Sequence, residues 1–130
     1  MTQPDDIVPV QRNEDREQVV PSAWRPTIAA IVAAFRDGDF ALERGIADVS
    51  LRASIDGAWL SDNVAAYGGT LDTLPPETWW TSVYVWMGEW WEVLVDLFTV
   101  EEGRSDLVLF LRVRERASKY EFEVTSLHVP

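Results

Sequence analysis

The hydrophobic positions change their period along the chain, from helical spacing before residue 70 to strand spacing after residue 80. After Pro21-Ser22, apolar side chains recur every three or four residues until Gly38, which can end a helix in a left-handed conformation. This pattern predicts a helix capped by Ser22. Its inward side chains are expected to be Trp24, Ile28, Ile31, Val32 and Phe35.

Two shorter helices are expected before the period changes. Asp39 can cap one that runs to Arg44 and is closed by Gly45. The other lies within residues 54–67 and ends at Gly68-Gly69. The side chains that it would direct inward are Ile55, Trp59 and Tyr67.

Alternating apolar and polar residues in the last third of the chain predict an antiparallel meander of about four strands. The strands are expected at about 80–87, 90–99, 105–115 and 120–128. Gly88-Glu89 has the glycine-first form of a two-residue hairpin loop. Gly103 can supply the positive φ that a three-residue loop over residues 101–103 requires. Ala117-Ser118 would join the last two strands.

Residues 77–87 also admit a second interpretation. Pro75-Pro76 and Glu77 are typical of the first turn of a helix. The β-branched and aromatic side chains of TSVYVW, followed by the glycine turn, favour a strand instead.

Cross-strand pairing tests these turns, because a slip of one residue would move every side chain to the opposite face of the sheet. With the turns as placed, apolar residues pair on the inner face: Trp86 with Trp91, Tyr84 with Val93, Trp91 with Val113, Val93 with Leu111, Val95 with Leu109, Leu97 with Leu107, Val113 with Phe122, and Leu111 with Val124. Opposite charges pair on the other face: Arg112 with Glu92 and Glu123, and Arg114 with Glu121. The agreement of both faces favours this register.

Trp90 and Trp91 are neighbours in the sequence but point to opposite faces of the predicted sheet. Trp91 would join Trp80, Tyr84 and Trp86 in the core beneath the helices. Trp90 would lie outside, on a face that is apolar at one end and ionic at the other. The side chains of that face are Val83, Val85, Met87, Trp90, Leu94, Val108, Phe110, Glu92, Arg112 and Glu123. Such a face is typical of a dimer seam or a partner-binding surface, although the N-terminal tail could also cover it.

The length, cysteine content and net charge of the chain limit its domain organisation and the kind of partner that it can bind. The 130 residues suffice for one α+β domain, expected at residues 21–130 after a polar tail at residues 1–20. The absence of cysteine excludes disulfides and thiolate sites. A net charge of −11 disfavours nucleic acid and anionic membranes and suits a basic protein partner. Without a leader pattern or an apolar run of membrane-spanning length, we expect a cytoplasmic protein.

Candidate catalytic residues are few. The sequence contains no nucleophile elbow, phosphate loop or metalloprotease motif, and the acidic turn near Glu101 lacks calcium-loop spacing. We therefore expect no metal and no cofactor. His128 is predicted on the helix-facing side near Leu107, where it is more typical of a structural residue than of a general base. An alternative small-molecule pocket would be lined by Trp59, Tyr67, Trp86 and His128.

Several stretches carry a family resemblance over about residues 24–130. They are AFRDGDF, RGI, AYGGTLDTLP, WMGEWWEVLVDLFTVEEGRSDLVLFLRV and LHVP. Together they resemble an uncharacterised family of small bacterial proteins, a domain of unknown function, which implies no activity, cofactor or catalytic residue. A helix ending in GDF before a curved antiparallel sheet is more distantly similar to the nuclear-transport-factor-2-like α+β roll. That fold serves both enzymes and binding proteins.

These patterns lead to two functional hypotheses. The first is a non-enzymatic interaction protein that forms homo-oligomers or binds a protein partner through the face bearing Trp90. An acidic inhibitor of a basic toxin, of the immunity-protein kind, is one form of this hypothesis. The second is a small-molecule-binding protein or a hydrolase- or isomerase-type enzyme, with a pocket between helices and sheet near His128.

Overall fold

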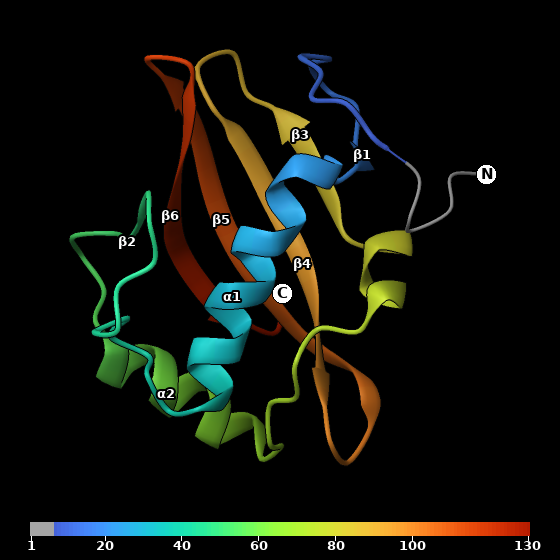
Figure 1. The fold of residues 1–130 in the computed structure, drawn as a ribbon. Helices are drawn as coiled ribbons and strands as arrows, with labels where there is room; N and C mark the ends of the chain where they lie inside the picture. Colours follow the sequence, from blue (N-terminus) through green and yellow to red (C-terminus); the bar gives the residue numbers. More distant parts are fainter. Residues whose placement is uncertain (1–6) are drawn as a thin grey trace.

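Four strands form a continuous antiparallel meander in the C-terminal part of the chain. The computed structural model describes residues 7–130, and Figure 1 shows the arrangement of its elements. The meander consists of β3 (Val83–Trp86), β4 (Trp91–Thr99), β5 (Gly103–Arg116) and β6 (Lys119–His128). The α+β class and the antiparallel meander agree with the prediction, and β3 is shorter than expected.

The first and third predicted turns join these strands, whereas the loop between β4 and β5 lies at residues 100–102, one residue earlier than predicted, because Thr99 pairs with Gly103. Gly88 has a φ of 95°, and the Met87 N–H donates to the carbonyl oxygen of Trp90 at 2.8 Å, which closes the β3–β4 hairpin. Gly103 has a φ of 75°, the positive value expected of it. Ala117 and Ser118 have φ values of 50° and 65°, as in the type I′ turn, whose twist suits a two-residue hairpin.

The predicted register is confirmed along the meander, with one exception. Trp86 pairs with Trp91, Trp91 with Val113, and Val113 with Phe122, as expected. The remaining predicted pairs that are observed are Tyr84–Val93, Val93–Leu111, Val95–Leu109, Leu111–Val124, Glu92–Arg112, Arg112–Glu123 and Arg114–Glu121. The sequence pattern therefore determines which side chains lie on each face.

The exception is the predicted pair of Leu97 with Leu107, which an irregularity in the ladder replaces. Asp96 pairs with Val108 and Phe98 with Arg104, so one residue of β4 lies opposite three residues of β5. The Ser105 hydroxyl donates to the Leu97 carbonyl oxygen at 2.8 Å and accepts from the Leu107 N–H at 3.1 Å. Ser105 thus satisfies the backbone groups that the lost ladder bonds would leave buried.

Two short edge strands extend the meander to a six-stranded sheet with the order β1-β3-β4-β5-β6-β2. β1 (Gln18–Val19) pairs antiparallel with β3, and β2 (Val49–Leu51) pairs parallel with β6. Two or three residues carry no alternation that sequence patterning could detect. Within the expected tail, residues 7–20 run beside β3 and include β1, whereas residues 1–6 lie outside the described part of the chain.

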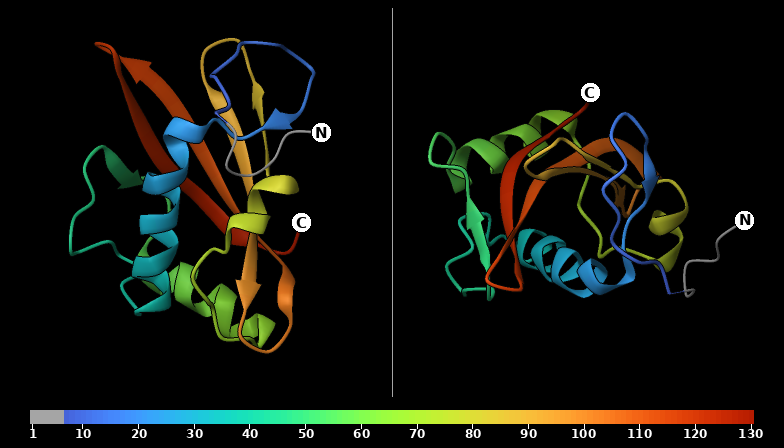
Figure 2. Two further views of the ribbon diagram at one scale, coloured as in Figure 1. Left: turned by 45° about the vertical axis from the view of Figure 1, so that its right-hand side comes forward. Right: turned by 90° about the horizontal axis from the view of Figure 1, so that it is seen from above.

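The sheet curves around one helix, so the core lies in its concave face (Figure 2). A turn of 3₁₀ helix, η1 (Ser22–Trp24), leads into α1 (Arg25–Arg36). The five predicted inward side chains, Trp24, Ile28, Ile31, Val32 and Phe35, are all buried. The predicted capping role of Ser22 is wrong, because no side-chain bond caps η1 or α1 and the Ser22 hydroxyl accepts from the Val8 N–H at 2.6 Å.

Trp24 occupies the centre of an aromatic cluster between α1 and the sheet. Its ring makes edge contacts with Tyr84, Trp91 and Tyr120, each at a centroid distance of 5.3 Å, and with Phe122 at 6.2 Å. Such edge-to-face pairs add to the free energy gained by burying the rings. The cluster joins the first helix to three strands of the meander.

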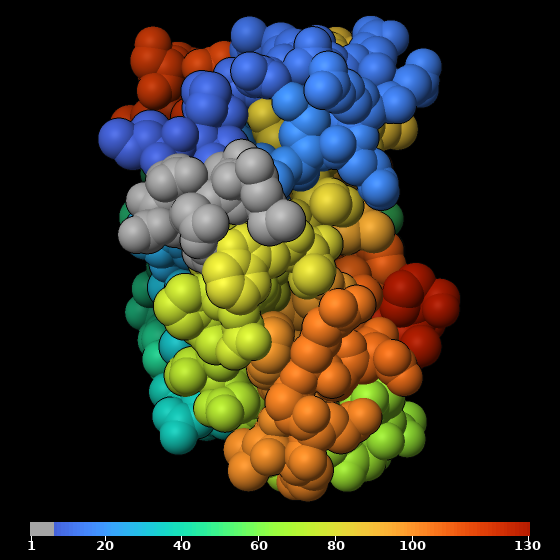
Figure 3. Space-filling view, turned by 90° about the vertical axis from the view of Figure 1, so that its right-hand side faces the viewer, coloured from blue at the N-terminus to red at the C-terminus, as the bar shows by residue number. Residues whose placement is uncertain are grey.

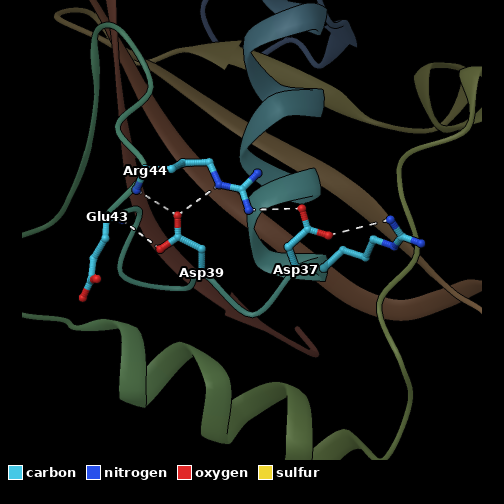
Figure 4. Close-up of polar contacts among 5 residues, drawn as sticks. Asp37, Asp39, Glu43 and Arg44 are labelled. Carbon is cyan, nitrogen blue, oxygen red and sulfur yellow. Dashed lines mark hydrogen bonds and ion pairs between the residues drawn. The ribbon is translucent and has the colours of Figure 1, made fainter.

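The predicted helix from Asp39 to Arg44 is wrong, because this segment forms consecutive turns. Leu42 has a φ of 57°, a left-handed conformation that interrupts a helix. The Asp39 carboxylate accepts hydrogen bonds from the backbone N–H groups of Glu43 at 2.8 Å and Arg44 at 3.1 Å (Figure 4). Asp39 therefore has the capping role that the sequence indicated, but it caps a turn.

The third predicted helix is present as α2 (Gly57–Tyr67) and ends at Gly68 as expected. Asp56 caps its first turn by accepting from the Trp59 N–H at 2.9 Å. Leu60 and Val64 are its buried residues, and Trp59 is 42% exposed. The prediction that Trp59 points into the core is therefore wrong. The helix begins at residue 57, and the side of it that faces the core carries Leu60 and Val64.

Residues 76–86 combine the helical and extended interpretations. Pro76–Trp80 form a 3₁₀ helix, η2, and the strand β3 begins only at Val83. Trp79 is buried beside the Arg25 guanidinium, whose carbon lies 5.5 Å from the ring centroid. Trp80 is 54% exposed, so its predicted place in the core is wrong. Strand parity does not apply to Trp80 because it lies in a helical turn.

Replacing Trp91 should be far more destabilising than replacing Trp80. Trp91 is 1% exposed and packs on Trp24, so Trp91→Ala is expected to lower the free energy of unfolding by roughly 3–5 kcal/mol. Trp80→Ala is the matched control and should change it by less than about 0.5 kcal/mol. Urea denaturation followed by circular dichroism measures both values, and equal losses would contradict the packing described.

Acid should weaken the contribution of Asp39 to stability. Backbone hydrogen bonds from Arg44 and Glu43 hold the pKa of Asp39 below its ordinary value. A lowered pKa adds stability above the ordinary carboxyl pKa, and this stability is lost as the pH falls through the folded-state pKa. Asp39→Ala should therefore destabilise the protein at about pH 7 and have a smaller effect at about pH 2.5, as measured by urea denaturation.

Asp37→Ala is the control for this experiment, because Asp37 makes ion pairs with Arg36 at 3.7 Å and Arg44 at 3.1 Å on the same surface. Exposed ion pairs contribute little to stability, so this variant should have a small effect at both pH values. An effect of Asp39→Ala that does not depend on pH would contradict the role assigned to its carboxylate.

Candidate functional site

The sheet face opposite α1 is here named the outer face. Figure 2 shows α1 in the concavity of the sheet and α2 beside the end of β6. Within residues 7–130, no helix lies across β3 and β4 on the outer face. The residues on the outer face include Val83, Val85, Trp90, Glu92, Leu94, Asp96, Val108, Phe110, Arg112, Arg114, Glu121, Glu123, Ser126 and His128.

Part of the outer face is apolar. Val83 lies opposite Leu94, and Leu94 lies opposite Phe110, so these three side chains form a row across three strands. All three are half-buried by their neighbours in the sheet. Val85 continues this surface on β3, next to Met87, which is 51% exposed in the following turn. This apolar surface is continuous across three strands, unlike the scattered single residues that are ordinary on a protein surface.

The other part of the outer face is ionic and centres on Trp90. The guanidinium carbon of Arg112 lies 4.1 Å from the Trp90 ring centroid, and that of Arg114 lies 5.4 Å away. The Trp90 indole N–H donates to Glu92 Oε1 at 3.0 Å, and the same oxygen accepts from Arg112 at 3.2 Å. Arg114 also forms an ion pair with Glu123 at 3.9 Å. Trp90 is therefore part of a cation–π and hydrogen-bond network.

Sequence reasoning placed Trp90 outside the core but missed the guanidinium groups over its ring. It placed Arg112 opposite Glu92 and Glu123 and Arg114 opposite Glu121, as the ladder confirms. The ion pair of Arg114 runs diagonally across the ladder to Glu123. Strand alternation could have indicated these contacts, because it places Arg112 and Arg114 on the same face of the sheet as Trp90. Arg112 Nε is buried and has no hydrogen-bond acceptor among the described residues.

The eight residues predicted to bind a partner are brought to one side of the sheet. Six lie on the outer face in their predicted register, at positions 83, 85, 92, 94, 110 and 112. Trp90 joins them through its contact with Arg112, and Met87 lies in the β3–β4 turn. These residues therefore share one surface.

The four residues of the alternative pocket are not brought together. Tyr67 and His128 border one surface hollow of about 380 Å³, together with Asn63, Ala66, Leu107 and Val129. Trp59 and Trp86 do not line it. Trp86 lies instead against Trp91, with ring centroids 4.7 Å apart.

His128 lies on the outer face, so its predicted helix-facing position is wrong. Phe110 pairs with Ser126 and Leu111 with Val124, which leaves Thr125 as an extra residue in β6. This bulge reverses the alternation, so that Leu127 is buried and His128 is exposed. The His128 ring stacks on Phe110 with centroids 4.5 Å apart, and its Nδ1 shares a hydrogen bond with the Ser126 hydroxyl.

Tyr67 is held as a hydrogen-bonding residue beside the hollow. Its hydroxyl accepts from the Asp106 N–H at 3.1 Å and donates to Glu102 at 2.6 Å. The Asp106 N–H lowers the pKa of Tyr67, but the bond to Glu102, burial and the charges of Glu102 and Asp106 together raise it. Tyr67 is therefore protonated at neutral pH and connects α2 to the β4–β5 hairpin.

Neither a metal centre nor a membrane span is found in the described residues. Between residues 7 and 130, no three His, Asp or Glu side chains converge in a way that could hold a metal ion. No helix in this range is both long and apolar enough to cross a bilayer.

Comparisons with known proteins place the chain in a family but assign no activity. The searches of curated proteins and of solved structures found no match. The distant resemblance to nuclear-transport-factor-2-like rolls and the bacterial origin stay predictions. A protein-family model described as a domain of unknown function, DUF7668, matches residues 32–130, from within α1 to the end of the chain. The chain belongs to this family.

Proposed function

We propose that the protein is a non-catalytic interaction protein that binds a second copy of itself through the outer face. The observation that carries this proposal is the half-buried row of Val83, Leu94 and Phe110 across three strands, over which no helix of the described residues lies. Two such sheets can pack face to face and bury their apolar rows against each other, as in β-sandwiches. Burial of this row would remove apolar surface from water, which drives association.

The charges of the outer face suit a second copy better than a basic partner. The four charged residues around Trp90 are Glu92, Arg112, Arg114 and Glu123, two of each sign, although the whole chain carries −11. A two-fold interface brings the same patch of both subunits together, so a patch with both signs can be complementary to itself. A surface that selected a strongly basic protein would carry an excess of carboxylates.

The enzyme hypothesis has less support from the geometry. Of its four residues, Tyr67 and His128 share an open hollow, and the hydroxyl of Tyr67 is already engaged with Glu102 and Asp106. His128 is stacked on Phe110. Its imidazole thus adds apolar and aromatic surface to the end of the proposed interface.

Leu94→Asp should prevent self-association. The substitution places a carboxylate in the apolar row, and burying that charge against a second copy would be costly. The wild-type chain of 14.8 kDa should sediment as a dimer, with a Kd of about 10 µM or lower, and the variant should sediment as a monomer. Sedimentation equilibrium measures both, and circular dichroism checks that the variant is folded.

Val100→Asp is the matched control, because Val100 is 67% exposed at the β4–β5 turn and lies away from the outer face. This variant carries the same new charge and should remain a dimer. A wild-type protein that stays monomeric throughout the concentration range would reject self-association. Loss of the dimer in both variants would show that the outer face is not the interface.

Salt should strengthen the dimer. Each chain carries −11, so two copies repel each other at long range, and added salt screens this repulsion. Raising the ionic strength from about 0.05 M to about 0.5 M should lower the Kd several-fold, as measured by sedimentation equilibrium. A Kd that rises steeply with salt would indicate attraction between opposite charges and would oppose a mainly apolar contact.

A further inference from the structure

The N-terminal segment of residues 7–17, here named the strap, closes one end of the concave core. Figure 3 shows the N-terminal residues at the top of the molecule, above η2 and the β4–β5 hairpin. The Trp91 indole N–H donates to the Gln11 carbonyl oxygen at 2.8 Å, and the Gln11 N–H donates to the Tyr84 hydroxyl at 2.8 Å. The strap is therefore fixed by its backbone to two core aromatic residues.

Arg12 places its guanidinium against the aromatic end of the core. The guanidinium carbon lies 5.2 Å from the Trp86 ring centroid and 5.1 Å from that of Trp91. One terminal nitrogen forms an ion pair with Glu115 at 2.6 Å. Trp86, Trp91 and Glu115 are here named the arginine cage. Two indole faces and one carboxylate together recognise both the charge and the planar shape of a guanidinium.

One wall of the cage, Trp91, is buried, whereas the side chain that fills the cage is on the surface. Trp91 is 1% exposed, and it is held by its ladder with β5 and by its bond to Gln11. The Arg12 side chain is 54% exposed. It can leave the cage without unfolding the strap, because backbone hydrogen bonds to Ser22, Tyr84 and Trp91 and the packing of Val10 against the core also hold the strap in place. An exposed ion pair contributes little net free energy, so a competing cation can replace it.

The cage residues lie inside the range that the family model matches, and Arg12 lies outside it. Trp86, Trp91 and Glu115 all lie within residues 32–130, which the family model covers, and Arg12 lies outside that range. The three cage residues therefore lie in the matched part of the chain, and the side chain that fills the cage lies in a segment outside it.

We propose that the arginine cage is a binding site for an arginine side chain of a basic protein partner, and that Arg12 occupies it as an internal competitor. The net charge of −11 favours encounter with such a partner. The partner can bind only those molecules in which Arg12 has left the cage. Its apparent affinity is therefore its intrinsic affinity multiplied by the fraction of such molecules. The cage is separate from the outer face, so this proposal does not rest on self-association.

The test uses the full chain and a small guanidinium probe. The probe is N-acetyl-L-arginine methylamide, titrated at constant ionic strength while the indole N–H signals of Trp86 and Trp91 are followed by ¹⁵N NMR. Arg12→Ala empties the cage and should lower the Kd of the probe by about tenfold relative to wild type. Arg16→Ala removes another arginine of the strap and should leave the Kd unchanged.

Two further measurements separate recognition in the cage from general attraction to an acidic protein. Arg12→Lys keeps the charge but loses the planar group, so its Kd for the probe should lie between those of wild type and Arg12→Ala. N-acetyl-L-lysine methylamide should bind Arg12→Ala several-fold more weakly than the arginine probe. Equal probe affinity in wild type and both Arg12 variants would overturn the proposal. Binding that leaves the Trp86 and Trp91 signals unmoved would overturn it as well.

Discussion

The register between β4 and β5 determines both candidate surfaces of this protein. Because Trp91 lies opposite Val113, its indole points into the concave core. Glu92 and Arg112, the next pair along the ladder, therefore point to the outer face. A slip of one residue would exchange these positions and would expose the core aromatic residues. The arginine cage and the outer face are thus two consequences of one pairing.

Side-chain alternation predicted the meander because its period is only two residues. A register slip of one residue would move every apolar side chain to the wrong face of the sheet. The β3–β4 and β5–β6 hairpins were predicted from local patterns, and opposite charges on the outer face supported the same register. Alternation failed where a strand gains an extra residue. The irregularity at Leu97 and the bulge at Thr125 depend on packing in the folded sheet, and the latter moved His128 to the other face. Trp80 was misplaced because its backbone is helical.

The candidate surfaces were predictable to different degrees. Most of the outer face followed from parity, but the guanidinium groups over Trp90 required the distances between side chains on β4 and β5. The arginine cage had no sequence signal, because Arg12 is more than 70 residues from Trp86 and lies in a polar segment without a period. Contacts of this kind are determined by the path of the strap across the sheet and not by local propensity.

The two short edge strands also have a consequence for solution behaviour. β5 and β6 have 14 and 10 residues and carry many β-branched and apolar side chains, a composition that favours uncontrolled strand addition between molecules. β1 and β2 cover the two lateral borders of the sheet with only 2 and 3 residues. The outermost strands therefore offer a neighbouring molecule only short templates on which to continue the ladder, which disfavours fibrillar growth from them.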